Sequence, residues 1–296
     1  MFKKEREISN LKNIGCKDLR IVQMEVSKTE NWNEIYDDKP LWMAKSYSTN
    51  KDIKTHSYDT GKVIRSICPN AKIFLLPSTK EGFEWCGENN IDVISVSLSG
   101  TFSDDLTELK LEDKIFNLIS SGNYGLESLL EEKRKKHWTS IGAVHLINNK
   151  IVRPSYSSTG KELDFVSFSN LDLHDDSNFS QGTSFSCPFA AGLIGQYIQI
   201  HFDYFGYKPT PKKINQFLLN NTIDLEKLGF DNETGNGLIR LPKEYKPFAH
   251  GLMKEWDEYV IKYIPEGFSK FEHNDEVLKK QLNKFMLDNN IKQLRT

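Results

Sequence analysis

The chain has 296 residues, of which 27% are charged and 38% hydrophobic, and its formal net charge is −2. This composition is typical of one large or two modest soluble domains with a buried core. The 39 basic and 41 acidic residues form no long basic run, so nucleic acid is not an expected partner. No apolar stretch approaches the length of a membrane span, which argues against a membrane protein.

Four cysteines lie scattered along the chain without the spacing of a metal site: Cys16, Cys68, Cys86 and Cys187. Such cysteines are typical of free thiols in a reducing compartment, because disulfides persist mainly in oxidising ones. The first residues are charged and lead into no apolar run, so no secretory signal is predicted. We therefore expect a cytoplasmic protein.

Short apolar runs alternate with helical segments along most of the chain. In order, they predict a strand over residues 19–26, a helix over 60–66, strands over 71–77 and 93–98, a helix over 109–121, a strand over 141–147 and a helix over 187–202. Continuous apolar runs of this length indicate parallel strands that are buried on both faces. The alternation predicts an α/β fold with a mostly parallel sheet, in which ligands bind beyond the carboxyl ends of the strands.

The character of the sequence changes near Leu241. Residues 1–242 are predicted to form the α/β domain, and residues 243–296 a charged, helical C-terminal extension. Amphipathic periodicity is clearest over residues 277–287. Such an extension either packs on the domain or binds a partner, and the sequence leaves both interpretations open.

One stretch, Gln181–Gly192, carries a serine between a glycine turn and a helix. Gly182 permits a sharp bend, and Pro188 is tolerated near a helix start because an early backbone N–H has no intrahelical partner. Ser184 would then lie at the positive end of the helix dipole, where developing negative charge is stabilised. A serine needs a base to become a nucleophile, so the motif predicts a histidine, a carboxylate and an oxyanion donor elsewhere. A structural helix with a glycine cap is the plain alternative.

The string GTSFSCPFAAG resembles the serine motif of the subtilisin-like serine peptidases, or subtilases. The resemblance covers roughly residues 15–242 and implies a three-layer, doubly wound sheet flanked by helices. It also implies the chain order carboxylate, histidine, asparagine, serine, as in subtilisin.

The histidine and carboxylate positions follow from that order. His56 begins a segment followed by Cys68-Pro69-Asn70-Ala71, which is similar to the family's strand entry after its catalytic histidine. Glu25 ends the first predicted strand, where the family has aspartate, and implies an atypical Ser-His-Glu triad. Glutamate can take this role, as it does in some α/β-hydrolases. Asp37, Asp38 and Asp59 are competing carboxylates, and a solvated Glu25 beside a degenerate site is the other alternative.

The segment Ile119–Gly125 resembles the family's small-small-Gly-Asn-x-Gly stretch and implies that Asn123 is an oxyanion donor together with the Ser184 N–H. An ordinary Asn-Tyr-Gly turn is the alternative. The resemblance further implies substrate-binding positions by backbone pairing and nearby pockets. These positions are Ser97, Leu98, Ser99, Gly100, Ser121, Gly122 and Thr183.

The resemblance implies a serine endopeptidase that hydrolyses an extended polypeptide through an acyl-enzyme. A subtilisin-like pseudopeptidase that binds a peptide without cutting it is the main alternative, and peptide ligation by the same acyl-enzyme is a third. About eighteen residues precede the first strand, too few for the family's propeptide. Either this form needs no propeptide, or inhibition comes from a separate protein inhibitor or regulator or from the C-terminal extension. No cofactor or metal is expected, since no acidic loop compels the structural calcium that many members carry.

Overall fold

The computed structural model describes residues 2–25, 32–37, 51–98, 111, 113–125, 138–173 and 179–243, with only the backbone for residues 32, 51–55 and 179. These residues belong to the unit that ends at Lys243. The predicted C-terminal extension lies outside the described residues apart from Lys243, so the boundary near residue 242 stays a prediction.

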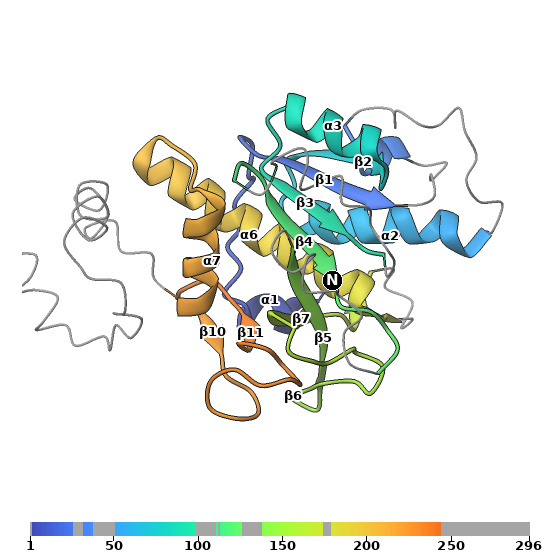
Figure 1. The fold of residues 1–296 in the computed structure, drawn as a ribbon, viewed down its shortest axis with the longest axis vertical. Coiled ribbons are helices and arrows are strands. Elements are labelled where there is room, and N and C mark those ends of the chain that lie inside the picture. The colour runs from blue at the N-terminus through green and yellow to red at the C-terminus, as the bar shows by residue number, and fades with distance from the viewer. Residues whose placement is uncertain are drawn as a thin grey trace, which may run out of the picture. The chain divides into compact units, whose positions relative to one another are not determined.

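A largely parallel sheet runs through the centre of this unit, in the strand order β10-β11-β7-β5-β4-β3-β1-β2 (Figure 1). Its strands are β1 (Arg20–Glu25), β2 (Lys72–Pro77), β3 (Val93–Val96), β4 (Phe116–Ser120), β5 (Thr139–Ile147), β7 (Phe165–Phe168), β10 (Thr222–Ile223) and β11 (Leu238–Ile239). Only β10 pairs antiparallel along this path. Strand β6 (Lys150–Val152) forms a hairpin with β5, and β8 (Leu171–Asp172) pairs with β9 (Phe179–Ser180).

Helices cover both faces of the sheet, as the predicted α/β class requires. The described helices are α1 (Lys3–Ile8), α2 (Lys51–Ile67), α3 (Lys80–Glu88), α6 (Thr183–Phe205) and α7 (Pro211–Asn220), with a 3-10 turn at Trp32–Glu34. Helices α2 and α6 pack against each other and on one face, where α6 crosses behind the middle strands (Figure 1). On the other face, Phe83 and Cys86 of α3 join the apolar cluster formed by β1, β2 and β3.

Helix α6 lies in the core. Its residues from Phe185 to His201 are all buried. Gly192 permits close contact with α2, because a Cβ added there would lie 2.8 Å from the Cβ of Ile67. A helix that is apolar on all sides is what such a central position requires.

The predicted helix over residues 109–121 is wrong. Residues Phe116–Ser120 form β4, which is buried along its whole length between β3 and β5. A short, continuous apolar run does not distinguish a buried strand from a helix by periodicity, and here parallel pairing on both sides favours the strand. The helix predicted over residues 60–66 is part of α2, and the one over 187–202 is part of α6.

Candidate active site

The candidate residues gather at the carboxyl ends of adjacent parallel strands. Glu25 is the last residue of β1, Ser97 follows β3, and Ser121 follows β4. Strands β1, β3 and β4 are parallel neighbours, so these three ends meet at one edge of the sheet. This is the edge at which α/β sheets bind ligands.

Glu25 contacts the ring of His56. Oε1 of Glu25 lies 3.1 Å from Nδ1 of His56, and the Glu25 side chain is fully buried while that of His56 is 28% exposed. The Thr60 hydroxyl lies 3.1 Å and the Gln23 amide nitrogen 3.2 Å from the same carboxylate oxygen. The longer side chain of glutamate therefore still brings a carboxylate oxygen to the histidine ring.

The competing carboxylates have other positions. Asp37 accepts hydrogen bonds from Arg65 and from the backbone N–H of Ile73, both at 2.7 Å. Asp59 follows His56 on α2, and its charge acts on the ring. Asp38 lies outside the described residues. Among the described carboxylates, Glu25 is the one that pairs with His56.

The environment of His56 shifts its protonation equilibrium. Burial of the ring opposes the charged imidazolium, but the Glu25 charge, its hydrogen bond and the more distant charge of Asp59 outweigh burial and raise the pKa of His56 above its ordinary value. The ring is also packed edge-on against Phe185, with ring centroids 5.8 Å apart. Both contacts hold the imidazole beside the start of α6.

Ser184 is the second residue of α6, after a glycine cap. Gly182 has φ 124°, a conformation that glycine adopts without strain. Helix α6 begins earlier than the sequence predicted, so Pro188 lies in its second turn rather than its first. Proline has no N–H, and therefore cannot donate to the carbonyl of Ser184 four residues earlier. That carbonyl instead accepts a hydrogen bond of 2.9 Å from the Ser97 hydroxyl.

The Ser184 hydroxyl donates to the backbone carbonyl of Ser97, at 3.1 Å. A hydroxyl carries a single hydrogen, so Ser184 does not donate to His56 in this arrangement. Rotation about the side-chain bond of Ser184 is needed before the histidine can accept that hydrogen.

Asn123 is oriented by the residue before Ser184. Its Oδ1 accepts hydrogen bonds from the backbone N–H and the hydroxyl of Thr183, at 2.8 and 2.9 Å. Since a backbone N–H only donates, the atom facing it is the amide oxygen, and the NH2 group of Asn123 is left to point elsewhere. Ser184 is within the first turn of α6, where backbone N–H groups have no intrahelical acceptor. The Asn123 amide and the Ser184 backbone therefore each keep a donor that these hydrogen bonds do not use.

The predicted substrate-binding positions have different exposures. Ser97, Ser121, Gly122 and Thr183 are buried, while Leu98 is half-buried. Ser99 and Gly100 lie outside the described residues. Thr183 also accepts a hydrogen bond of 3.2 Å from the Gly122 N–H. This hydrogen bond therefore joins the turn after β4 to the start of α6.

Several residues at the site were missed by sequence reasoning. Tyr156 accepts a hydrogen bond of 3.0 Å from the Gly182 N–H, and its hydroxyl also lies 2.7 Å from Nε2 of His145 and 3.0 Å from the Ser169 hydroxyl. Burial lowers the pKa of His145. The signal available in the sequence was a tyrosine inside a run of serines, which does not by itself identify a partner.

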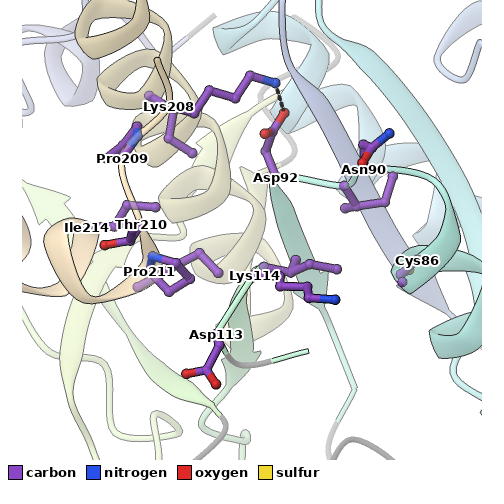
Figure 2. Close-up of a pocket in the computed structure, with 15 residues that line it drawn as sticks. Cys86, Asn90, Asp92, Asp113, Lys114, Lys208, Pro209, Thr210, Pro211 and Ile214 are labelled. Carbon is purple, nitrogen blue, oxygen red and sulfur yellow. Dashed lines mark hydrogen bonds and ion pairs between the residues drawn. The ribbon is translucent and has the colours of Figure 1, made fainter. Parts of the chain in front are cut away.

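The cavity drawn in Figure 2, of about 440 Å³, lies at the amino ends of the parallel strands, whereas the candidate site lies at their carboxyl ends. It is lined by residues at the amino ends of β3 and β4 and at the start of α7, including Asp92, whose carboxylate pairs with Lys208 at 2.8 Å (Figure 2). None of its lining residues is a candidate catalytic residue. The cavity and the candidate active site are therefore separate features.

The described residues contain no group of three or more His, Cys, Asp or Glu side chains that could hold a metal ion. The four cysteines are free and buried. Within the described ranges, no helix is both long and apolar enough to cross a membrane.

A serine in the first turn of a helix, a histidine–carboxylate pair and an oriented asparagine thus lie together at the carboxyl ends of the parallel strands of this α/β sheet. Residues 52–237 match the Subtilase family. This match spans well over half of the chain, and the chain therefore belongs to the subtilase family. It includes His56, Asn123 and Ser184, whereas Glu25 precedes it.

Solved structures have the same fold. A lanthipeptide protease aligns with a TM-score of 0.61 at 17% identity, covering 79% of this chain and 89% of that one. The prenylagaramide maturation protease PagA aligns with a TM-score of 0.59 at 16% identity, over 80% and 94%. The protease domain of PatA aligns with a TM-score of 0.60 at 14% identity, over 82% and 98%. At these identities the likeness concerns the fold. A comparison with curated protein sequences finds no significant match.

Proposed function

We propose that this subtilase is a serine endopeptidase that cleaves an extended polypeptide through a Ser184–His56–Glu25 triad. The observation that carries the proposal is the 3.1 Å contact between Glu25 Oε1 and His56 Nδ1, made by a fully buried carboxylate. A carboxylate on Nδ1 fixes the tautomer that leaves Nε2 free to accept a proton, and it stabilises the imidazolium formed next.

The proposed reaction begins when the Ser184 hydroxyl rotates from the Ser97 carbonyl toward His56. Nε2 of His56 takes the hydroxyl proton as Oγ attacks the scissile carbonyl carbon. The resulting oxyanion is proposed to accept hydrogen bonds from the Asn123 amide and the Ser184 backbone N–H, because donors fixed in advance stabilise charge as it develops. His56 then gives the proton to the leaving amine as the C–N bond breaks, and water hydrolyses the acyl-enzyme by the same route.

The substrate is proposed to lie along the end of β3. Ser97 provides a backbone carbonyl there, and Leu98 is the half-buried side chain beside it. When an extended chain pairs with such a strand end, backbone groups supply affinity and side-chain pockets supply preference. A substrate N–H that hydrogen-bonds the Ser97 carbonyl would compete with the Ser184 hydroxyl and release it for transfer to His56. No cofactor takes part in these steps.

The experiment that tests the proposal is labelling with a fluorophosphonate probe, followed by peptide mapping. One adduct on Ser184 is expected in the unmodified protein and none in Ser184→Ala. Labelling that persists in Ser184→Ala would place the nucleophile elsewhere.

One observation favours a second candidate, a pseudopeptidase that binds peptides without cleavage. The Ser184 hydroxyl donates to Ser97 and not to His56. A binder of this kind would show no fluorophosphonate adduct and would keep its peptide affinity in Glu25→Ala. A peptidase would lose most of its turnover in that variant.

A further inference from the structure

Gln23 is a fully buried polar residue near the carboxyl ends of the strands that carry the candidate site. It lies in β1 two residues before Glu25 and has no exposed surface. Because side chains alternate along a strand, Gln23 and Glu25 point to the same face of the sheet. An apolar residue is the usual occupant of a position between two parallel neighbours, and burial of an amide requires hydrogen bonds to be tolerated.

The Gln23 amide nitrogen uses both of its hydrogens on residues of the site. It lies 3.2 Å from Oε1 of Glu25 and 2.9 Å from the hydroxyl oxygen of Ser97. The orientation of the amide follows from chemistry: a carboxylate only accepts, so the group that faces it must be NH2. The Ser97 hydroxyl accepts from Gln23 and donates its own hydrogen to the Ser184 carbonyl, at 2.9 Å.

The contacts form a continuous chain from the carboxylate to the backbone of the serine. Glu25, Gln23, Ser97 and the Ser184 carbonyl are linked in that order, and the last link exists because Pro188 supplies no N–H to that carbonyl. Glu25 and Gln23 are fully buried, and Ser97 is 2% exposed. Hydrogen bonds at such sites are stronger than in water, and an unpaired carboxylate there is costly.

We propose that Gln23 is a positioning residue that holds the Glu25 carboxylate against His56. A glutamate side chain has one more rotatable bond than aspartate, so its carboxylate needs to be restrained to keep an oxygen at Nδ1. Gln23 and Thr60 donate to the oxygen that faces His56. Gln23 is itself anchored on Ser97, and therefore ties the carboxylate to the turn that carries Ser184. This inference rests on the proposed triad.

The test is the substitution Gln23→Met, which keeps side-chain length and removes both hydrogen bonds. The first readout is an NMR pH titration of histidine-labelled protein, with the His56 signal assigned by its loss in His56→Gln. If Gln23 holds the carboxylate in place, the pKa of His56 in Gln23→Met falls toward the value measured in Glu25→Ala. A pKa that stays at or above that of the unmodified protein overturns the proposal. This titration needs no enzymatic activity, so it is informative even if the protein proves to be a pseudopeptidase.

The second readout is turnover per titrated active site. Gln23→Met is expected to lower kcat by roughly ten- to a hundredfold with little change in KM, which is the range for one lost hydrogen bond to a charged group. In a Glu25→Ala background the same substitution is expected to change kcat little, because Gln23 acts through Glu25. An equal loss in both backgrounds would contradict that.

The matched control is Gln196→Met. Gln196 is also fully buried, and its amide nitrogen donates to the backbone carbonyls of Lys12 and Ile67, at 2.8 and 2.9 Å. Gln196 Oε1 also accepts from the Lys12 backbone N–H at 2.7 Å, so this substitution removes three hydrogen bonds, one more than Gln23→Met. It is expected to lower the melting temperature, while the pKa of His56 and kcat per active site stay unchanged. If the control moved the His56 titration as much as Gln23→Met does, the role of Gln23 would be purely structural.

Discussion

The two sides of the candidate site are built in different ways. On the serine side, Asn123 and Thr183 bond through backbone groups and short side chains, and Gly182 and Pro188 set the course of the chain. On the histidine side, Glu25 is held by side chains from separate elements. A turn defined by backbone geometry restricts which residues fit, whereas a carboxylate oxygen can reach the same place from aspartate or glutamate. Glu25, which stands where the family has aspartate, therefore lies on the histidine side.

The largest expected effect comes from breaking the histidine side. Glu25→Gln keeps the shape of the side chain but removes its charge and favours the wrong tautomer of His56. A fall in kcat of about 10³–10⁴-fold is expected, as for comparable triads. Steady-state hydrolysis of a peptide ester measures it, and circular dichroism checks the fold. Turnover within a factor of a few of the unmodified protein would exclude Glu25 from the triad.

The serine side is broken next by Asn123→Ala. Removal of one preorganised donor to the oxyanion is expected to lower kcat by about 10²–10³-fold, with little effect on KM. The same peptide ester assay serves for this variant. Asn123→Asp is a useful comparison, because it keeps an oxygen for Thr183 while replacing the donor with a negative charge. If Asn123→Asp retained full turnover, an oxyanion role for this side chain would be wrong.

Tyr156→Phe removes a support of the turn before Ser184 while it leaves the sequence of the stretch Gln181–Gly192 unchanged, and so it sharpens the comparison. The substitution deletes the oxygen that accepts the Gly182 N–H. A buried donor left without an acceptor costs about 1–3 kcal/mol of the free energy of unfolding, and we expect kcat per active site to fall about tenfold. Chemical denaturation and active-site titration measure the two effects. Tyr204→Phe, at the 46% exposed Tyr204 near the far end of α6 from Ser184, is the control for turnover and should leave kcat per active site unchanged.

The smallest expected effect is on the pH profile. Burial opposes protonation of His56, but Glu25 and Asp59 outweigh it and raise its pKa above 6.5. A general base must be neutral, so kcat/KM is expected to fall as the pH drops through that raised pKa. In Glu25→Gln the acidic limb should move to lower pH because the favourable charge is lost. A limb that stayed in place would show that another group controls it.

Local motifs pointed to Gly182, Ser184 and Asn123, because these residues occur in short strings that require particular backbone turns; the structure brings them together, while their catalytic roles stay proposals. Glu25 was predicted from its place at a strand end and faces His56 in the structure, while its catalytic role stays a proposal. Thr60 and Tyr156 were not predicted, because their partners lie on other elements and no local pattern records such contacts. Gln23 is only two residues from Glu25 on β1, but its second partner, Ser97, is distant in the sequence, and no local pattern records that link. The helix expected over residues 109–121 failed for a similar reason: the pairing of β4 with β3 and β5 is a long-range property.

The most direct test of the central claim is a pre-steady-state burst with an activated peptide ester, together with the masses of the products. A Ser184 nucleophile served by His56 and Glu25 predicts a burst of one molar equivalent of leaving group per chain, an acyl adduct on Ser184, and hydrolysed products. The burst should disappear in Ser184→Ala and slow sharply in Glu25→Ala. A protein that binds the peptide tightly but releases no leaving group, or one whose burst survives in Ser184→Ala, would contradict the account.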